Sequence, residues 1–278
     1  MDKSKIKNFI IILLALVNAF LLTIVISNEG EKRSAREYRN TALKTVLEDN
    51  GIYLYPNVTL PEKMLPELYL SRDLSKEKRK LSSFIGSCTA KDLGGNIIFY
   101  SNANGQANFR GNGAFEILLN SDIIALGENP VDGCKTALKK LGIKYSNAEP
   151  NITVSGGSTT VTMLCAWEDE NIYNAEIRFD FTSDRLFLIQ GTQPSGSLTS
   201  QRQAENPPDA VTVLMNFLQY TRQTGEICSE IRSLELGYFL NAVVSGSSSL
   251  KPVWRIETDV GNYYINGFTG LPESLDAA

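Results

Sequence analysis

An uncharged apolar run near the N-terminus constrains the fold more than any other part of this 278-residue chain. Residues 9–26 read FIIILLALVNAFLLTIVI, which lies at the short end of the length that crosses a bilayer as an α-helix. Three lysines precede the run against a single acid, Asp2, so the positive-inside rule places the leader, residues 1–8, in the cytoplasm. We therefore expect a single-pass cell-membrane protein whose C-terminal domain is extracellular.

A cleaved signal peptide is the alternative interpretation of this run. Its apolar core is usually about 7–15 residues long and ends at small residues of the Ala-x-Ala type. The run here is longer, and Val25-Ile26-Ser27-Asn28 is a poor cleavage site, so an uncleaved anchor is favoured.

Asn18 is the one strongly polar side chain inside the apolar run. It is either a tolerated amide that bonds to its own backbone or a hydrogen-bonding contact to another membrane helix, which would be worth about 1 kcal/mol. We name Asn18 as the candidate membrane-helix contact.

The composition excludes several classes of function. The chain contains no histidine, which removes Ser-His-Asp and Cys-His catalysis, His-ligated metal sites and imidazole acid–base chemistry. A formal net charge of −4 gives no electrostatic attraction for nucleic acid. The hydrophobic content of 42% and charged content of 21% are typical of an ordered globular protein.

Four cysteines, Cys88, Cys134, Cys165 and Cys228, lack any Cys-x-x-Cys spacing, so zinc-ribbon and thioredoxin-like sites have no support. An even number outside the membrane permits two disulfides. Four buried thiols are an equally good interpretation, because cysteine packs as a small apolar residue. The sequence leaves both open.

Helical spacing and capping residues predict helices within residues 29–51, 74–88, 129–143 and 208–225. Ser75 is the expected N-cap of the second helix. Asn104-Gly105 predicts a β-hairpin, because both residues tolerate positive φ.

Two later segments share one layout of strand, acid-containing turn, strand, Gly and Thr: residues 173–194 and 252–270. Each follows a predicted helix, which indicates a divergent repeat of a helix and an antiparallel meander. We therefore predict an α+β fold, in which a single N-terminal transmembrane helix is followed by an exterior domain of such repeated units. The expected divisions are residues 1–8, 9–26, 27–125, 126–200 and 201–278.

The search for catalytic motifs finds no Gly-x-Ser-x-Gly elbow, P-loop or dinucleotide fingerprint. The acids in WEDEN, residues 167–171, lack calcium-loop spacing and favour a solvated turn. A Ser–Lys dyad stays open but has no specific motif behind it. We predict a protein that is not an enzyme, with no cofactor, metal or small-molecule substrate.

The leader resembles the opening of the YycI/YycH regulators of Gram-positive bacteria. The matching positions are Met1, Asp2, Ser4, Lys5, Lys7, Asn18 and Phe20-Leu21-Leu22, whereas Lys3 stands where that pattern has Trp. Residues 95–117 and 253–270 also look like the family's first and last hairpins. This resemblance implies an accessory protein of the essential sensor histidine kinase that governs cell-wall metabolism. Such a protein would contact the kinase and a related YycH-like membrane protein through its membrane helix and exterior domain.

The terminal unit alone is also similar to PepSY-type modules, in which a helix precedes a strand pair that ends near Asn-x-x-Thr-Gly. This second resemblance implies the alternative function, an inhibitor or chaperone of an exported peptidase.

Period-two alternation divides the terminal hairpin into two faces. The expected core face holds Trp254, Ile256, Thr258, Tyr263 and Ile265. The opposite face leaves Arg255, Glu257 and Tyr264 to meet solvent or a partner, and we name these three as the candidate exterior partner surface.

Overall fold

The structure, a computed structural model, describes Leu14, Asn18 and Leu22 and then residues 33–120, 123–124, 129–182, 185–242 and 247–273. The chain divides into two compact units, Met1–Leu54 and Tyr55–Ala278. The first unit contains a helix over residues 33–49, a turn, and the short strand β1 (Tyr53–Leu54). Gly51 has φ +78° in that turn and ends the helix where its position predicted.

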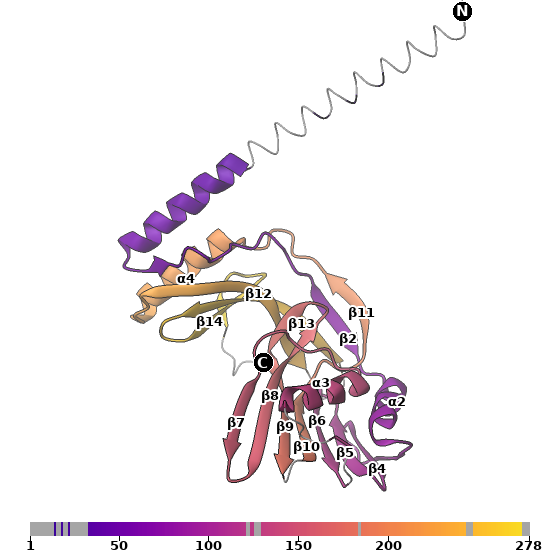
Figure 1. Cartoon of the computed structure of the whole chain (residues 1–278). Coiled ribbons are helices and arrows are strands. Elements are labelled where there is room, and N and C mark those ends of the chain that lie inside the picture. Colours follow the sequence, from indigo (N-terminus) through magenta and orange to yellow (C-terminus); the bar gives the residue numbers. More distant parts are fainter. Residues whose placement is uncertain are drawn as a thin grey trace, which may run out of the picture. The chain divides into compact units, whose positions relative to one another are not determined.

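The second unit is built on one hydrogen-bonded sheet. Its strands are β2 (Glu67–Ser71), β3 (Thr89–Asp92), β4 (Ile97–Asn102), β5 (Gly105–Arg110), β6 (Ala114–Leu119), β7 (Asn151–Ser155), β8 (Ser158–Trp167), β9 (Glu170–Thr182), β10 (Arg185–Thr192), β11 (Ser197–Arg202), β12 (Glu230–Ala242), β13 (Ser247–Thr258), β14 (Asn262–Asn266) and β15 (Pro272–Glu273). The main path runs β11-β2-β13-β12-β9-β10-β6-β5-β4-β3. The hairpin β7–β8 joins at β9, and β14–β15 joins at β13 (Figure 1).

The predicted fold was wrong. No helix among the described residues is long and apolar enough to cross a membrane. The predicted span, residues 9–26, falls outside the described residues except for Leu14, Asn18 and Leu22. The described residues are 45% strand and 25% helix, and their strands form one sheet instead of separate helix-plus-meander units.

The physical reason lies in strand pairing between the predicted segments. β2, from the first predicted segment, pairs with β11 on one side and with β13 on the other. β6, also from the first, pairs with β10 of the second. Each such pair satisfies backbone N–H and C=O groups that a separate unit would leave at its own edge.

Two helices cover one face of the sheet. α2 (Leu74–Ile85) and α3 (Pro130–Leu141) pack on each other and on strands β4–β6 and β8–β10 (Figure 1). The shared core includes Leu81, Phe84, Ile85, Ala137, Leu138, Tyr100, Phe109, Ile117, Phe179 and Ile189. On the opposite face, alternate residues of β5, β8 and β9 such as Asn108, Thr162 and Arg178 form a polar region, as expected for an antiparallel sheet with one solvated side.

The third helix of this unit, α4 (Ala210–Thr224), lies against the terminal hairpin. The rings of Phe217 and Tyr263 are 4.9 Å apart. Trp254, Ile256, Thr258 and Ile265 are buried, as predicted for the core face of this hairpin, whereas Tyr263 is only partly buried.

Helix ends follow local chemistry. Asn129 and Gly142 bound α3, and Asp209 and Gly225 bound α4, so both helices lie within their predicted ranges. The N-cap of α2 is Asp73 and not Ser75, because the Asp73 carboxylate accepts a hydrogen bond from the Lys76 backbone N–H at 2.9 Å.

Candidate interaction surface

An irregularity in β9 positions the candidate surface. Leu164 of β8 pairs with Glu176, but the next residue, Cys165, pairs with Ile172, so residues 173–175 bulge out of the ladder. Such bulges re-aim side chains. Here the bulge carries Tyr173 toward β12 and β13.

The same bulge lies where two parts of the sheet meet: one part contains β2 and β11–β15, and the other contains β3–β10. β9 and β12 run parallel and share the register pair Tyr238–Ile172. The side-chain amide of Asn174 donates to the Leu240 carbonyl at 2.9 Å and accepts from the Leu240 N–H at 2.7 Å. Asn174 thus supplies with its side chain the hydrogen bonds that a regular strand supplies with its backbone.

The close approach of these strands requires Gly237. A Cβ atom at this position would lie 2.6 Å from the Asn171 carbonyl oxygen and 2.8 Å from the Tyr173 ring. Any larger residue would therefore push β12 away from the bulge.

Arg255 is the centre of the candidate surface. It lies on β13, between Glu235 of β12 and Tyr264 of β14 in the register of the sheet. Its guanidinium is 3.3 Å from a carboxylate oxygen of Glu235 and 3.3 Å from one of Glu257. It also lies over the Tyr173 ring, 5.5 Å from the centroid, in cation–π geometry.

Exposure divides this group into a fixed centre and an accessible rim. The Arg255 side chain is 22% exposed, whereas those of Glu235 and Glu257 are 42% and 41% exposed. The Arg255 Nε is buried and has no hydrogen-bond partner. Because the carboxylates are well solvated, these pairs contribute little stability and serve chiefly to orient the guanidinium.

A cluster of mostly aromatic side chains lies on the sheet face that carries Arg255, and its Tyr173 ring contacts the guanidinium. Tyr173, Phe239, Val253 and Tyr264 form a small buried cluster. The Tyr173 hydroxyl donates to Glu235 at 3.3 Å, and burial, followed by the Glu235 charge, raises the pKa of that hydroxyl. We call Tyr173, Glu235, Arg255, Glu257 and Tyr264 the Arg255 surface.

The predicted exterior residues therefore come together, with one difference in exposure. Arg255 and Glu257 are in contact and partly exposed, as alternation predicted. Tyr264 is only 8% exposed, because its ring packs against Tyr173 and Phe239 at centroid distances of 5.7 and 4.9 Å. Asn18, the candidate membrane contact, is an exposed helical residue whose neighbours in the sequence lie outside the described residues.

Sequence reasoning missed Tyr173 and Glu235. Glu235 could have been found from the alternation of β12, once β12 was paired with β13 in its observed register. Tyr173 had no such signal, since a β-bulge leaves no period in the sequence.

A polar row continues on the helix-free face next to this surface. Five residues are aligned across adjacent strands by register: Asn108, Glu116, Gln190, Arg178 and Thr162. They line a shallow depression of about 480 Å³ that also includes Glu176. Burial raises the pKa of Tyr264, and the Glu176 charge adds to this rise while the Arg255 charge opposes it.

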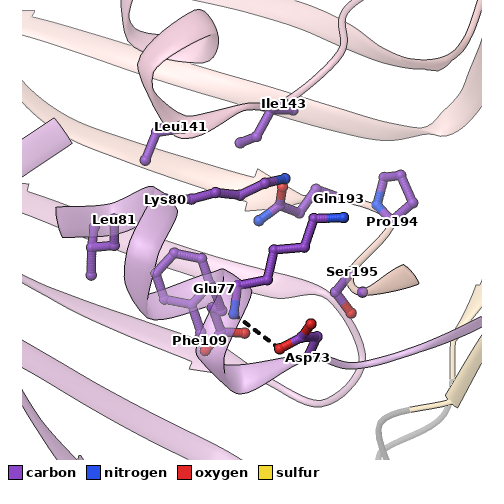
Figure 2. Close-up of a pocket in the computed structure, with 12 residues that line it drawn as sticks. Asp73, Glu77, Lys80, Leu81, Phe109, Leu141, Ile143, Gln193, Pro194 and Ser195 are labelled. Carbon is purple, nitrogen blue, oxygen red and sulfur yellow. Dashed lines mark hydrogen bonds between the residues drawn. The ribbon is translucent and has the colours of Figure 1, made fainter. Parts of the chain in front are cut away.

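A small cleft on the other side of the sheet holds two lysines (Figure 2). It lies between the start of α2, the end of α3 and residues 193–196. Lys80 Nζ donates to the Gly142 carbonyl at 2.8 Å, and burial, followed by the nearby Lys76 charge, lowers the pKa of Lys80. At about 30 Å³ the cleft has room for little more than a water molecule.

Ser195 also lines this cleft, so the cleft is a place where the Ser–Lys dyad left open by the sequence can be examined. Its Oγ is buried without a hydrogen-bond partner, so neither Lys76 nor Lys80 is placed to take its proton. A nucleophilic serine needs such a base within hydrogen-bonding reach.

The four cysteines are free thiols, and all are buried. Burial raises the pKa of Cys134 and of Cys165 to about 12. Across the described residues, no group of three or more acids and cysteines is arranged to hold a metal ion.

Comparison with known proteins adds little. No protein-family model matches the chain, and no curated protein matches it either. Among solved structures, the chain is similar to an uncharacterized protein from Eubacterium rectale, with 10% sequence identity and a TM-score of 0.49. The match covers 76% of this chain and 86% of that one, and carries no argument about function.

Proposed function

We propose that this chain is a regulatory protein that acts by binding another protein through the Arg255 surface. The observation that supports this proposal is the guanidinium of Arg255, which is held between two half-exposed carboxylates and over a tyrosine ring. Arginine and tyrosine are enriched at the energetic centres of protein interfaces. Residues fixed on neighbouring strands also lose little conformational freedom on binding.

The proposed partner is the one that the leader resemblance implies: a sensor histidine kinase, together with a related YycH-like regulator. The surface offers one guanidinium and two carboxylates, so a complementary partner would present both negative and positive charges to it. A partner that pairs with all three groups would be oriented as well as bound.

The proposal can be tested by measuring binding of the purified full-length chain to the kinase and to the sister regulator. We expect Arg255→Glu to weaken binding at least about tenfold, because it replaces the central cation by a third carboxylate. Glu257→Gln removes one rim charge while keeping an oxygen that can accept from Ser233, and should weaken binding less.

Arg232→Glu is the matched control. Arg232 is an exposed arginine on β12 that pairs with Glu230 at 3.1 Å, outside the Arg255 surface. Its charge reversal should leave binding unchanged. If Arg255→Glu unfolds at the temperature of the unmodified chain and still binds both partners equally well, the Arg255 surface is not the binding site.

A further inference from the structure

Strand β7 is an outer strand with an unprotected edge. In the part of the chain that the structure describes, β7 pairs only with β8, and all five of its residues are exposed. Ile152 is 45% exposed and Val154 is 72% exposed. An open strand edge presents a row of N–H and C=O groups that another strand can pair with.

Other outer strands of this sheet carry features that discourage pairing, and β7 carries none. β3 ends in Lys91 and Asp92, β11 has an irregular register and ends in Arg202, and β15 has two residues. β7 has the sequence NITVS, with no charge, no proline and an unbroken register against β8. Charges, bulges and short length are the usual protections of an edge.

Local chemistry fixes both ends of this edge. Pro150 precedes the strand and has no N–H to donate. Gly156 and Gly157 follow it with φ +59° and +81°, which is the two-residue turn that closes a hairpin. Such a turn makes Ser155 and Ser158 a hydrogen-bonded pair, so the backbone groups of Ile152 and Val154 point away from β8.

The strand is complementary to itself. In an antiparallel pair centred on Thr153, Ile152 of one copy lies opposite Val154 of the other, and their outward backbone groups can exchange hydrogen bonds. Both side chains lie on the core side of the sheet, since Ile152 pairs with the buried Val161. Branched aliphatic residues facing each other across a strand pair are stabilising.

We propose that β7 binds the β7 strand of a second copy of this chain, which joins the two sheets edge to edge. The pairing is isologous, as expected for a two-fold dimer. The uncharged strand meets an uncharged strand, so no charge is left unpaired at the contact. A contact between two five-residue strands buries much less surface than the roughly 1,200 Å² or more that stable complexes bury. The dimer is therefore weak, and its population depends on concentration.

Disulfide trapping in the full-length chain tests the register. Thr153→Cys places two thiols opposite each other at a non-hydrogen-bonded pair, where Cα atoms are about 4.5 Å apart and a disulfide can form. The native thiols are buried and do not compete. We expect a covalent dimer on oxidation, formed several-fold faster than with Lys91→Cys on the edge strand β3. Equal rates for the two variants would overturn the proposal.

Sedimentation velocity over a range of concentrations supplies the second test. Val154→Lys puts a cation on the seam and should raise the dissociation constant at least about tenfold, with the melting temperature unchanged because Val154 is exposed. Leu198→Lys, at an exposed apolar residue of β11, is the matched control and should leave the dissociation constant as it was. A chain that is monomeric at every concentration, or a dimer that survives Val154→Lys, would contradict the proposal.

Discussion

Glu77 connects three segments through a single carboxylate. Arg72, from the loop before α2, forms two hydrogen bonds to it, both at 2.9 Å, and the Tyr100 hydroxyl of β4 donates to it at 2.9 Å. The side chains of Arg72 and Glu77 are 6% and 9% exposed, so this is a buried ion pair. Arg72 also donates to the Phe109 carbonyl at 3.2 Å, which ties α2 to β5.

We expect Glu77→Gln to lower the free energy of unfolding by about 3–5 kcal/mol, because it leaves the Arg72 charge buried without a counter-ion. Urea denaturation would measure the change. Glu230→Gln is a suitable control, since Glu230 pairs with Arg232 near the surface and its loss should cost less than about 1 kcal/mol. Equal losses of unfolding free energy in the two variants would show that the buried pair stabilises the protein no more than the surface pair does.

At the residue scale, the sequence predicted which residues of the terminal hairpin face the core, but not the full exposure of the others. Alternation placed Trp254 and Ile256 correctly, because the strand is regular there. It could not predict that Tyr264 is buried, because the side chain that covers it, Tyr173, comes from a bulge some ninety positions earlier.

Asp259 links elements at the turn between β13 and β14. Its carboxylate accepts hydrogen bonds from the Ser229 hydroxyl at 2.6 Å, the Ser229 N–H at 3.1 Å and the Glu230 N–H at 3.2 Å. These bonds hold the start of β12 against the turn. They favour the ionised form, and the pKa of Asp259 is lowered from 3.8 to about 2, with the Ser229 hydroxyl as the largest cause.

The stabilisation from Asp259 should depend on pH. A carboxyl with a lowered pKa contributes fully above its unfolded pKa, and loses the contribution as the pH falls from 3.8 towards 2. We expect Asp259→Asn to melt at a lower temperature than the unmodified chain near neutral pH, and the gap to close as the pH approaches 2. A gap that is the same at both ends of this range would rule out ionisation as its source.

Helices were easier to predict than strand partners at the element scale. α3 and α4 lie within the predicted ranges 129–143 and 208–225, because helix formation and capping depend on neighbouring residues. The hairpin of β4 and β5 was also predicted, but its turn lies at residues 103–104 and not at Asn104-Gly105, since Asn102 pairs with Gly105. The position of β2 between β11 and β13 depends on contacts far apart in sequence, for which no local pattern exists.

Across the whole second unit, the two parts of the sheet meet at β9 and β12, where Asn174 replaces backbone pairing. Removing this side chain would leave the N–H and C=O of the buried Leu240 without partners. Each unsatisfied buried group costs about 1–3 kcal/mol. This free-energy cost weakens the contact between β9 and β12, and leaves the packing within each part of the sheet unchanged.

We expect Asn174→Ala to separate the unfolding of the two parts. The chain has two tryptophans, Trp167 on β8 and Trp254 on β13, so each part carries its own fluorescent probe. With either tryptophan replaced by Phe, the urea midpoints should coincide in the parent chain and diverge after Asn174→Ala. Asn216→Ala, which removes one hydrogen bond to Gly270 within the terminal part, is the control and should leave the midpoints together.

The division into separate repeated units was the largest error at this scale. Repeated local patterns suggested separate units because each pattern resembles a complete meander. The unpaired edges of such meanders are satisfied by strands from other segments, and pairing of this kind is a property of the whole unit.

The buried cysteines have a practical consequence. They lie just before β3, in α3, in β8 and just before β12, so each reports on a different part of the second unit. Because the thiols are buried, an alkylating reagent reaches each one only when its surroundings open. Timed alkylation followed by mass spectrometry would therefore rank the opening rates of four regions in the unmodified protein, without a single engineered label.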